Sequence, residues 1–223
     1  MAAIKPCDAA SLLLYRQQDK SFEVLVGRRP SKSRFMPDVY VFPGGAVDAA
    51  DARAKPATML NEAYALHMAV GKSQARAQTI AMAAVRETFE ETGLSITKAG
   101  SPGLVKDQTW QALAEQGVSA DLSVLSYFAR ATTPADQPIR FHARFFVCNS
   151  EDVSGLDTNQ FKQTDELLDL RWMPIHNPEN LRLRSVTRFL LDEFAEWLDP
   201  SEKHKGYPAF TQKSGKPVVV RSG

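Results

Sequence analysis

Three glutamates and an arginine share one short stretch of the chain. Residues 86–94 read Arg-Glu-Thr-Phe-Glu-Glu-Thr-Gly-Leu, so Glu87, Glu90 and Glu91 follow one another at the i, i+3 and i+4 spacing. On a helix, this spacing places the three carboxylates on one face within about one turn. Arg86 can offset part of the repulsion, but one cation among three anions leaves the face negative. A hard divalent cation such as Mg²⁺ or Mn²⁺, which prefers oxygen ligands, would neutralise the excess charge.

Two further features would hold these carboxylates in place. Apolar residues at helical spacing give the expected helix a buried face: Ile80, Ala81, Ala84, Val85 and Phe89. Gly93 is expected to end that helix. Upstream, residues 39–42 form an apolar run that closes on Pro43-Gly44-Gly45, which predicts a strand followed by a glycine turn. Without this upstream feature, the acidic cluster would be typical of a solvated patch at the end of a surface helix.

Strand, glycine turn and acidic helix together resemble the Nudix hydrolases. The box of that family runs Gly, five residues, Glu, seven residues, then Arg-Glu-aliphatic-any-Glu-Glu-any-Gly-aliphatic. Residues 86–94 match its second half, and residues 42–45 match the segment that leads into it. The resemblance implies an α/β fold, a Nudix-type α/β/α sandwich with a mixed β-sheet. In this chain, a helical insertion would precede the catalytic helix.

The resemblance also implies roles for the residues that match the box. Glu87, Glu90 and Glu91 would bind Mg²⁺ or Mn²⁺ and would be catalytic through these ions. The backbone carbonyl of Gly45 would add a further ligand, and Arg86 would orient the carboxylates. The implied reaction uses such ions because they neutralise charge that develops on a diphosphate.

The chain departs from the family box in three ways. About 27 residues are inserted between Gly45 and Arg86 relative to the family pattern. Counting back from Arg86 places Gln78 where the first glutamate of the box belongs, and Thr88 replaces an aliphatic residue. None of these changes removes a residue that the resemblance assigns to metal. We therefore expect the activity to survive while the supporting hydrogen bonds differ.

The insertion, assigned to residues 49–73, narrows the resemblance further. Together with residues 34–37 and 41–48, it is similar to a branch of Nudix proteins that includes the peroxisomal coenzyme A diphosphatases. Within the insertion, Pro56 is placed to open a helix and Gly71 to stop it. This helix would either cover the core or form a lid or wall of the substrate pocket.

Further site residues are expected outside the catalytic helix. Arg28, Arg29 or Arg34 would face the anionic substrate, because guanidinium groups suit phosphate oxygens. The sequence does not choose among these arginines, and a solvated basic loop is the alternative. We also expect Phe42 and Gly44 to contact the substrate.

Residues 164–174 resemble the late Nudix strand that ends in an Arg-Trp pair. Acidic residues near this point supply a general base in some relatives, so Glu166 and Asp165 are candidates for that role. A structural salt bridge is the alternative for both. An earlier strand of the suspected branch carries Arg-Phe-Asp-Thr, where this chain has His142 and Ala143 in the last two positions.

The remaining elements follow from periodicity and turn residues. Residues 9–16 and 22–29 predict a hairpin, and residues 94–97, 122–130 and 141–147 predict further strands. Short and long helices are expected over residues 107–116 and 186–198. Residues 1–200 would form a single domain, and residues 201–223 a polar, loosely held tail.

Composition restricts the class of protein. The chain has 223 residues, 43% of them hydrophobic and 24% charged, which suits one sizeable core. A net charge of +1 argues against a nucleic-acid partner. No run approaches the length of a membrane span. Two cysteines, Cys7 and Cys148, are too few for a disulfide framework and indicate a reducing, cytoplasmic compartment.

The resemblance implies hydrolysis of a nucleoside diphosphate linked to another moiety. Coenzyme A or an acyl derivative is the leading small-molecule substrate, and ADP-ribose or a nucleotide sugar is the alternative. A non-catalytic nucleotide-binding sensor is a second reading, which the changes at Gln78 and His142 keep open. Retention of all three glutamates favours the enzyme, because a binding protein has less need for such an acidic cluster. Nudix proteins often dimerise, so a homodimer is also compatible with the resemblance.

Overall fold

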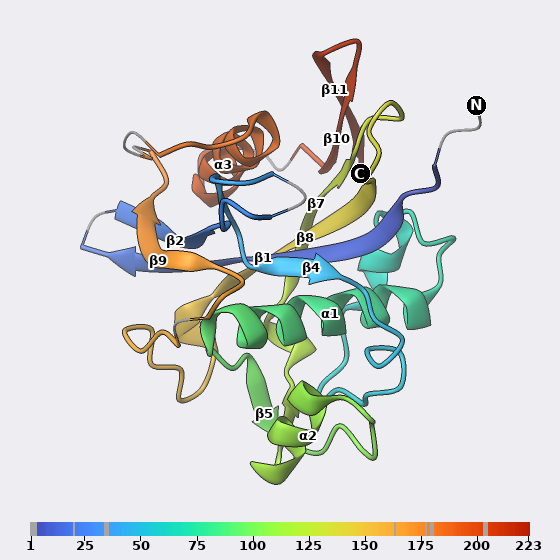
Figure 1. Cartoon of the computed structure of the whole chain (residues 1–223), viewed down its shortest axis with the longest axis vertical. Helices are drawn as coiled ribbons and strands as arrows, with labels where there is room; N and C mark the ends of the chain where they lie inside the picture. The colour runs from blue at the N-terminus through green and yellow to red at the C-terminus, as the bar shows by residue number, and fades with distance from the viewer. Residues whose placement is uncertain are drawn as a thin grey trace.

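A mixed β-sheet lies at the centre of the computed structural model (Figure 1). The structure describes residues 4–19, 21–33, 36–162, 164–176, 178, 181–202 and 205–223, and nine strands within these ranges form one sheet. Seven of the strands follow the order β11-β10-β7-β8-β1-β2-β3, while β4 pairs with β1 and β9 pairs with β2. Their bounds are β1 (Cys7–Gln18), β2 (Ser21–Arg28), β3 (Tyr40–Val41), β4 (Gly44–Ala46), β7 (Ser126–Thr132), β8 (Phe141–Asn149), β9 (Leu168–Pro174), β10 (Tyr207–Lys213) and β11 (Lys216–Ser222). The pairs β1–β8 and β7–β10 are parallel and the others are antiparallel.

Strand β1 shows why both faces of the sheet must be covered. Successive side chains of a strand point to opposite faces. Leu12 and Leu14 accordingly join the core beside one face, whereas Leu13 joins the core beside the other, and all three are fully buried. The predicted hairpin is confirmed, because β1 and β2 pair antiparallel from Tyr15 opposite Val24 onward.

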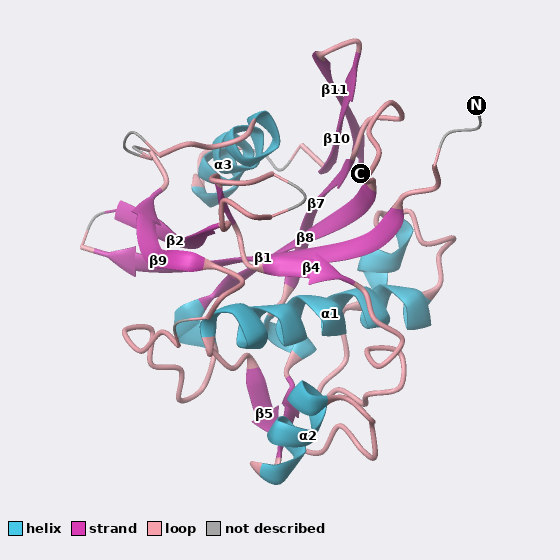
Figure 2. Ribbon diagram, viewed as in Figure 1, coloured by secondary structure: helices cyan, strands magenta, loops and turns pink. Residues whose placement is uncertain are grey.

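Helices cover the two faces and complete the predicted α/β/α sandwich (Figure 2). Helix α1 (Gln74–Thr92) lies against one face and α3 (Ser185–Leu198) against the other. Ser73 caps α1 by accepting a hydrogen bond from the backbone N–H of Arg76. Gly93 ends α1 in the left-handed region at φ 76°, as predicted. In the described part of the chain, none of the helices combines the length and apolarity that crossing a membrane requires.

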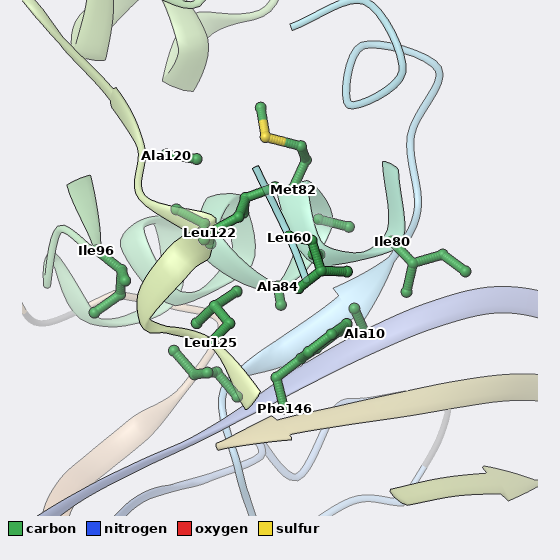
Figure 3. Close-up of a cluster of buried hydrophobic side chains, with 14 of the residues drawn as sticks. Ala10, Leu60, Ile80, Met82, Ala84, Ile96, Ala120, Leu122, Leu125 and Phe146 are labelled. Carbon is green, nitrogen blue, oxygen red and sulfur yellow. The ribbon is translucent and has the colours of Figure 1, made fainter. Parts of the chain in front are cut away.

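The core on the α1 face fixes the position of that helix. Figure 3 shows Ile80, Met82 and Ala84 of α1 among buried side chains of the sheet and of the loops. Alanines at 77, 81, 83 and 84 are fully buried, and their short side chains allow neighbouring elements to approach the helix closely. The helix is therefore held closely against β1 and β4.

The insertion differs from the predicted helix. Only a short 3₁₀ helix, η1 (Glu62–Leu66), forms within it. Tertiary hydrogen bonds take the backbone groups that a continuous helix would need: Ala57 N–H donates to the carbonyl of Ala120, and Arg144 Nε donates to the carbonyl of Met68. Because Met68 and Leu60 are also buried in the core, the insertion covers the core on the α1 face.

A small unit follows α1 and contains helix α2. Strands β5 (Thr97–Ala99) and β6 (Val118–Ala120) pair antiparallel and flank α2 (Gln108–Glu115), which confirms the short helix expected over 107–116. The strand expected from residue 122 begins only at Ser126, since residues 122–124 form the 3₁₀ turn η2. The side chain of Asp121 caps this turn by accepting from the backbone N–H of Ser123.

The C-terminal residues contradict the expectation of a loosely held tail. Strands β10 and β11 form a hairpin, and β10 extends the sheet by pairing with β7 at Ala209 and Phe210. Ser214 and Gly215 both have positive φ, 51° and 75°, which suits the two-residue turn between twisted strands. Tyr207 further anchors the hairpin, because its ring contacts the rings of Tyr64, His67 and Tyr127.

Candidate metal centre

Carboxylates from two distant parts of the chain converge at α1. One oxygen each of Glu87, Glu91 and Glu166 lies within 4.8 Å of the other two. Glu87 and Glu91 are one helical turn apart, and Glu166 arrives from the loop before β9. Three carboxylate oxygens so close together suit a hard divalent cation. The sequence predicts a general base at Glu166 or Asp165 and no metal ligand at either; Asp165 is outside this group of carboxylates.

The glycines of β4 contact these carboxylates directly. They form a strand paired with β1, with Gly44 opposite Ser11, where the sequence predicted a turn. The Gly44 N–H donates to Glu91 Oε2 at 2.7 Å. A Cβ added at Gly45 would lie 2.5 Å from the carboxyl atoms of Glu87. A side chain at 45 would therefore push the Glu87 carboxylate out of its place, because the strand backbone approaches the acid so closely. Binding of metal by the Gly45 carbonyl stays a prediction.

Glu90 takes a different direction from the other two glutamates of α1. Its Oε2 accepts from Arg86 Nη1 at 2.8 Å, and its Oε1 accepts from Thr109 Oγ1 of α2 at 2.6 Å. Each residue turns an α-helix by about 100°, so Glu87 and Glu91 differ by about 40° around the axis, whereas Glu90 lies about 100° from Glu91. Glu87 and Glu91 therefore point in the most similar directions on the predicted face of α1, and Glu90 points furthest from Glu91.

Arg86 is the buried cation at the centre of a network of acids. It is 6% exposed and makes two bonds to Asp51, Nε to Oδ1 at 2.8 Å and Nη2 to Oδ2 at 3.1 Å. Its Nη1 also donates to Glu87 Oε1 at 2.9 Å. Trp110 Nε1 supplies a further donor to Asp51 Oδ1 at 3.3 Å. Burial opposes the charge on Arg86, but the hydrogen bond to Asp51 and the neighbouring carboxylates raise its pKa above the ordinary value.

Asp51 was missed as a site residue, although a signal for it exists. Counting forward from Gly45, the first acid of the family box falls on the sixth position, which is Asp51. The structure places Asp51 against Arg86, so the extra residues are inserted after Asp51 and not directly after Gly45. Gln78, expected at the position of this acid, has no hydrogen bond to its buried amide oxygen within the described residues.

Burial changes the protonation of the two central carboxyl groups. Desolvation raises the pKa of Glu87 to about 7, although Arg86 acts in the opposite direction. Desolvation also raises the pKa of Glu91 well above its ordinary value, while the Gly44 N–H partly opposes this change. Both groups therefore bind a proton more readily than an ordinary glutamate when no cation is near, and a bound divalent cation would favour their charged forms.

The structure separates the arginines that the sequence could not distinguish. Arg29 is close enough to Glu91 to lower the pKa of that carboxyl electrostatically. Arg28 instead pairs with Asp38 at 3.3 Å. Successive residues at the end of β2 point to opposite faces, which explains the difference. Arg34 lies outside the described residues.

Phe42 is not placed as a substrate contact. Its side chain is 4% exposed and packs in the core on the α3 face. The alternation of side chains in this segment sends Phe42 into the core, while the following backbone at Gly44 reaches Glu91. Contact between Gly44 and the substrate stays a prediction.

His142 lies in β8 opposite Asp8 of β1 and beside the fully buried Arg144. Its Nε2 is buried and has no hydrogen-bond partner among the described residues. Burial lowers the pKa of His142 to about 4, and the positive charges of Arg144 and Arg130 act in the same direction. The group is therefore neutral at pH 7 and belongs to a structural cluster, separate from the three converging carboxylates.

We expect His142 to make the stability of the protein pH-dependent. The folded pKa of about 4 lies below the ordinary value of 6.5, so the unfolded chain binds an extra proton between these values. The contribution to stability is present above pH 6.5 and is lost as the pH falls through 4. Denaturant unfolding at a series of pH values should detect this loss, and His142→Gln should remove that part of it. An NMR titration midpoint of His142 near 6.5 would contradict the expectation.

Comparison with known proteins gives a family match over most of the chain. A model of the NUDIX domain matches residues 5–198. The chain is 28% identical over 185 residues to a Caenorhabditis elegans protein named "Putative nudix hydrolase 7"; the match covers 74% of this chain and 50% of that protein. The chain thus spans about half the length of this relative.

Solved structures are similar over most of the chain. A NUDIX hydrolase from Alicyclobacillus acidocaldarius is 27% identical, with a TM-score of 0.64, over 86% of this chain and 91% of that one. The NUDIX domain of Shewanella oneidensis NrtR, solved in complex with ADP ribose, has a TM-score of 0.51 at 12% identity. The match covers 88% of this chain and 90% of that domain, and the likeness is one of fold alone.

Proposed function

Because this chain belongs to the Nudix family, we propose that it hydrolyses a nucleoside diphosphate linked to another moiety, with the help of Mg²⁺ or Mn²⁺. The observation that carries this proposal is the convergence of oxygens from Glu87, Glu91 and Glu166 within 4.8 Å. These are hard donors, and such a site holds its cation together with waters and substrate phosphates. The close backbone of β4 supports the carboxylates from the side opposite α1.

The residues of the site would have different roles in such a reaction. A divalent cation held by the carboxylates of α1, with the Gly45 carbonyl as a further ligand, would supply Lewis acidity toward the diphosphate and the attacking water. Arg86, held by Asp51, keeps Glu87 in position. Glu166 is the exposed member of the carboxylate group and can accept the proton of the water. Arg29 adds a positive charge near Glu91, where a substrate phosphate would be bound.

Coenzyme A or an acyl derivative is the leading substrate, and ADP-ribose or a nucleotide sugar is the alternative. The insertion, assigned to residues 49–73, supports the first choice together with residues 34–37 and 41–48, because these segments carry the resemblance to the coenzyme A diphosphatases. The cytoplasmic compartment and the homodimer stay predictions from the sequence, and the single domain is proposed to extend beyond residue 200, because β10 and β11 belong to the same sheet. Glu90 stays a proposed additional ligand.

A substrate panel tests the proposal. The purified protein would be incubated with Mg²⁺ or Mn²⁺ and with coenzyme A, acyl-coenzyme A, ADP-ribose, NADH and dinucleoside polyphosphates, and the products would be separated by chromatography. A parallel incubation with a chelator provides the control. Cation-dependent cleavage of coenzyme A to 3′,5′-ADP and a phosphopantetheine supports both class and substrate. Cleavage of ADP-ribose alone would retain the reaction and overturn the leading substrate, and binding without cleavage would favour a sensor.

Replacing Glu166 by Gln is expected to slow turnover by about 10² to 10⁴-fold, the range that a positioned general base contributes. Asp165→Asn is the matched control, since Asp165 is exposed in the same loop but is not part of the carboxylate group. Turnover numbers at saturating cation would measure both effects. Equal losses in the two variants would contradict a specific role for Glu166.

A further inference from the structure

We propose that Thr109 of α2 is a positioning residue for the metal centre and acts through Glu90. This inference rests on the proposed function, because it concerns the same cation site. It adds a residue from outside the family box and from a separate element of the fold. The hydroxyl group of Thr109 would set the direction of the Glu90 carboxylate by holding Oε1, the oxygen that Arg86 of α1 does not contact.

The contacts of Glu90 support this role. The Thr109 hydroxyl donates to Oε1 at 2.6 Å and Arg86 Nη1 donates to Oε2 at 2.8 Å, so the two oxygens are held from different sides. Hydrogen bonds to an ionised acceptor are short and stronger than those between neutral groups. Thr109 is 8% exposed, which limits competition from water. Each carboxylate oxygen keeps a second acceptor position, and Arg86, which holds Oε2 of Glu90, also donates to Glu87 of the carboxylate group.

The position of the hydroxyl group is itself well determined. Asp107 caps α2 by accepting from the backbone N–H of Trp110 at 3.0 Å, which fixes the first turn of that helix. Trp110 is fully buried and donates to Asp51. Adjacent residues of α2 therefore contact the two acids on either side of Arg86: Thr109 contacts Glu90, and Trp110 contacts Asp51. Helix α2 is in this way a support for the whole network.

Loss of the Thr109 hydroxyl group should weaken cation binding, and not only change the stability of the fold. Without its donor, Oε1 of Glu90 would be released, and the carboxylate, held only by Arg86 at Oε2, could turn about that bond. Partners that orient metal ligands typically change metal affinity by 10 to 100-fold when they are removed. We therefore expect Thr109→Val to weaken Mn²⁺ binding by about tenfold.

The experiment is a Mn²⁺ titration followed by EPR on the full-length protein, with four variants. Thr109→Val should raise the Mn²⁺ dissociation constant by about tenfold, and Thr109→Ser, which keeps the hydroxyl, should bind like the wild type. Glu90→Gln is combined with Thr109→Val in a double-mutant cycle. If Thr109 acts through Glu90, Thr109→Val should have little further effect in the Glu90→Gln background. Thermal melts would confirm that each variant is folded.

Three outcomes would overturn the inference: Thr109→Val binds Mn²⁺ like the wild type, Thr109→Ser fails to restore binding, or the effect persists in the Glu90→Gln background. These outcomes are separate from the proposed hydrolysis. A wild type that binds Mn²⁺ but cleaves no substrate would overturn the hydrolase while the role of Thr109 is still measured. A wild type that binds no Mn²⁺ would overturn both.

Discussion

Replacing Glu91 by Gln is expected to reduce kcat/KM by about 10³-fold, which corresponds to about 4 kcal/mol of lost transition-state stabilisation. Gln has the shape of Glu and can still accept from the Gly44 N–H, but it lacks the negative charge that a divalent cation requires. Glu91 is 4% exposed, so no solvent-facing group would replace it. Steady-state kinetics at several cation concentrations would measure the loss.

The fold of the Glu91→Gln variant should be intact. Burial raises the pKa of Glu91, which means that the charged form is unfavourable in the folded protein when no cation is bound. Removing the charge should therefore leave the free energy of unfolding in chelator unchanged or higher. Glu115→Gln, at the exposed end of α2, is a control that should change neither quantity. A wild-type rate in Glu91→Gln would contradict its assignment to metal.

Replacing Asp51 by Ala should lower the free energy of unfolding by about 3 kcal/mol, because the buried Nε and Nη2 of Arg86 then lose their charged partner, although Glu87 and Glu90 still pair with Nη1. The Asp51 side chain is fully buried and Arg86 is nearly so, and two hydrogen bonds join them. Turnover should also fall, because Arg86 then loses the anchor that holds it beside Glu87. Urea unfolding in chelator would measure the stability change without a contribution from the cation.

Gln78→Ala is the matched control for Asp51→Ala. Counting back along the family box selects Gln78 and counting forward selects Asp51, so the two variants compare the two alignments directly. Since the Gln78 amide oxygen has no partner within the described residues, its removal should cost less than about 1 kcal/mol. A larger loss for Gln78→Ala than for Asp51→Ala would contradict the assignment of Asp51 to the network.

Local patterns in the sequence were enough to predict most of the elements that position the site. The apolar face of α1, its end at Gly93 and the β1–β2 hairpin depend on residues close together in the chain. Features that depend on distant partners were not predictable in this way. Glu90 turns toward Thr109 of another helix, and the carbonyl of Met68 is taken by Arg144, which lies 76 residues away. Contacts of this kind decide where a side chain points and whether a local helix forms. They leave no pattern in the sequence of a single segment.

The C-terminal hairpin also depends on a partner that is distant in the sequence. Its polar and glycine-containing sequence predicted a loose tail, because the partner strand β7 lies far upstream and supplies the pairing. A two-residue Ser214-Gly215 turn between β-type runs was the available signal. The turn residues therefore predicted the structure of this segment better than its polarity did.

Because β10 pairs with β7, the folded sheet extends beyond the region that the family model matches. The family match stops at residue 198, before either strand of the hairpin begins. A protein shortened at that residue would leave β7 as an open sheet edge, with backbone groups free to pair with another molecule and with the ring of Tyr127 uncovered on the Tyr207 side. Aggregation of such a shortened protein would thus report a lost neighbour in the sheet and not a defect in the catalytic region.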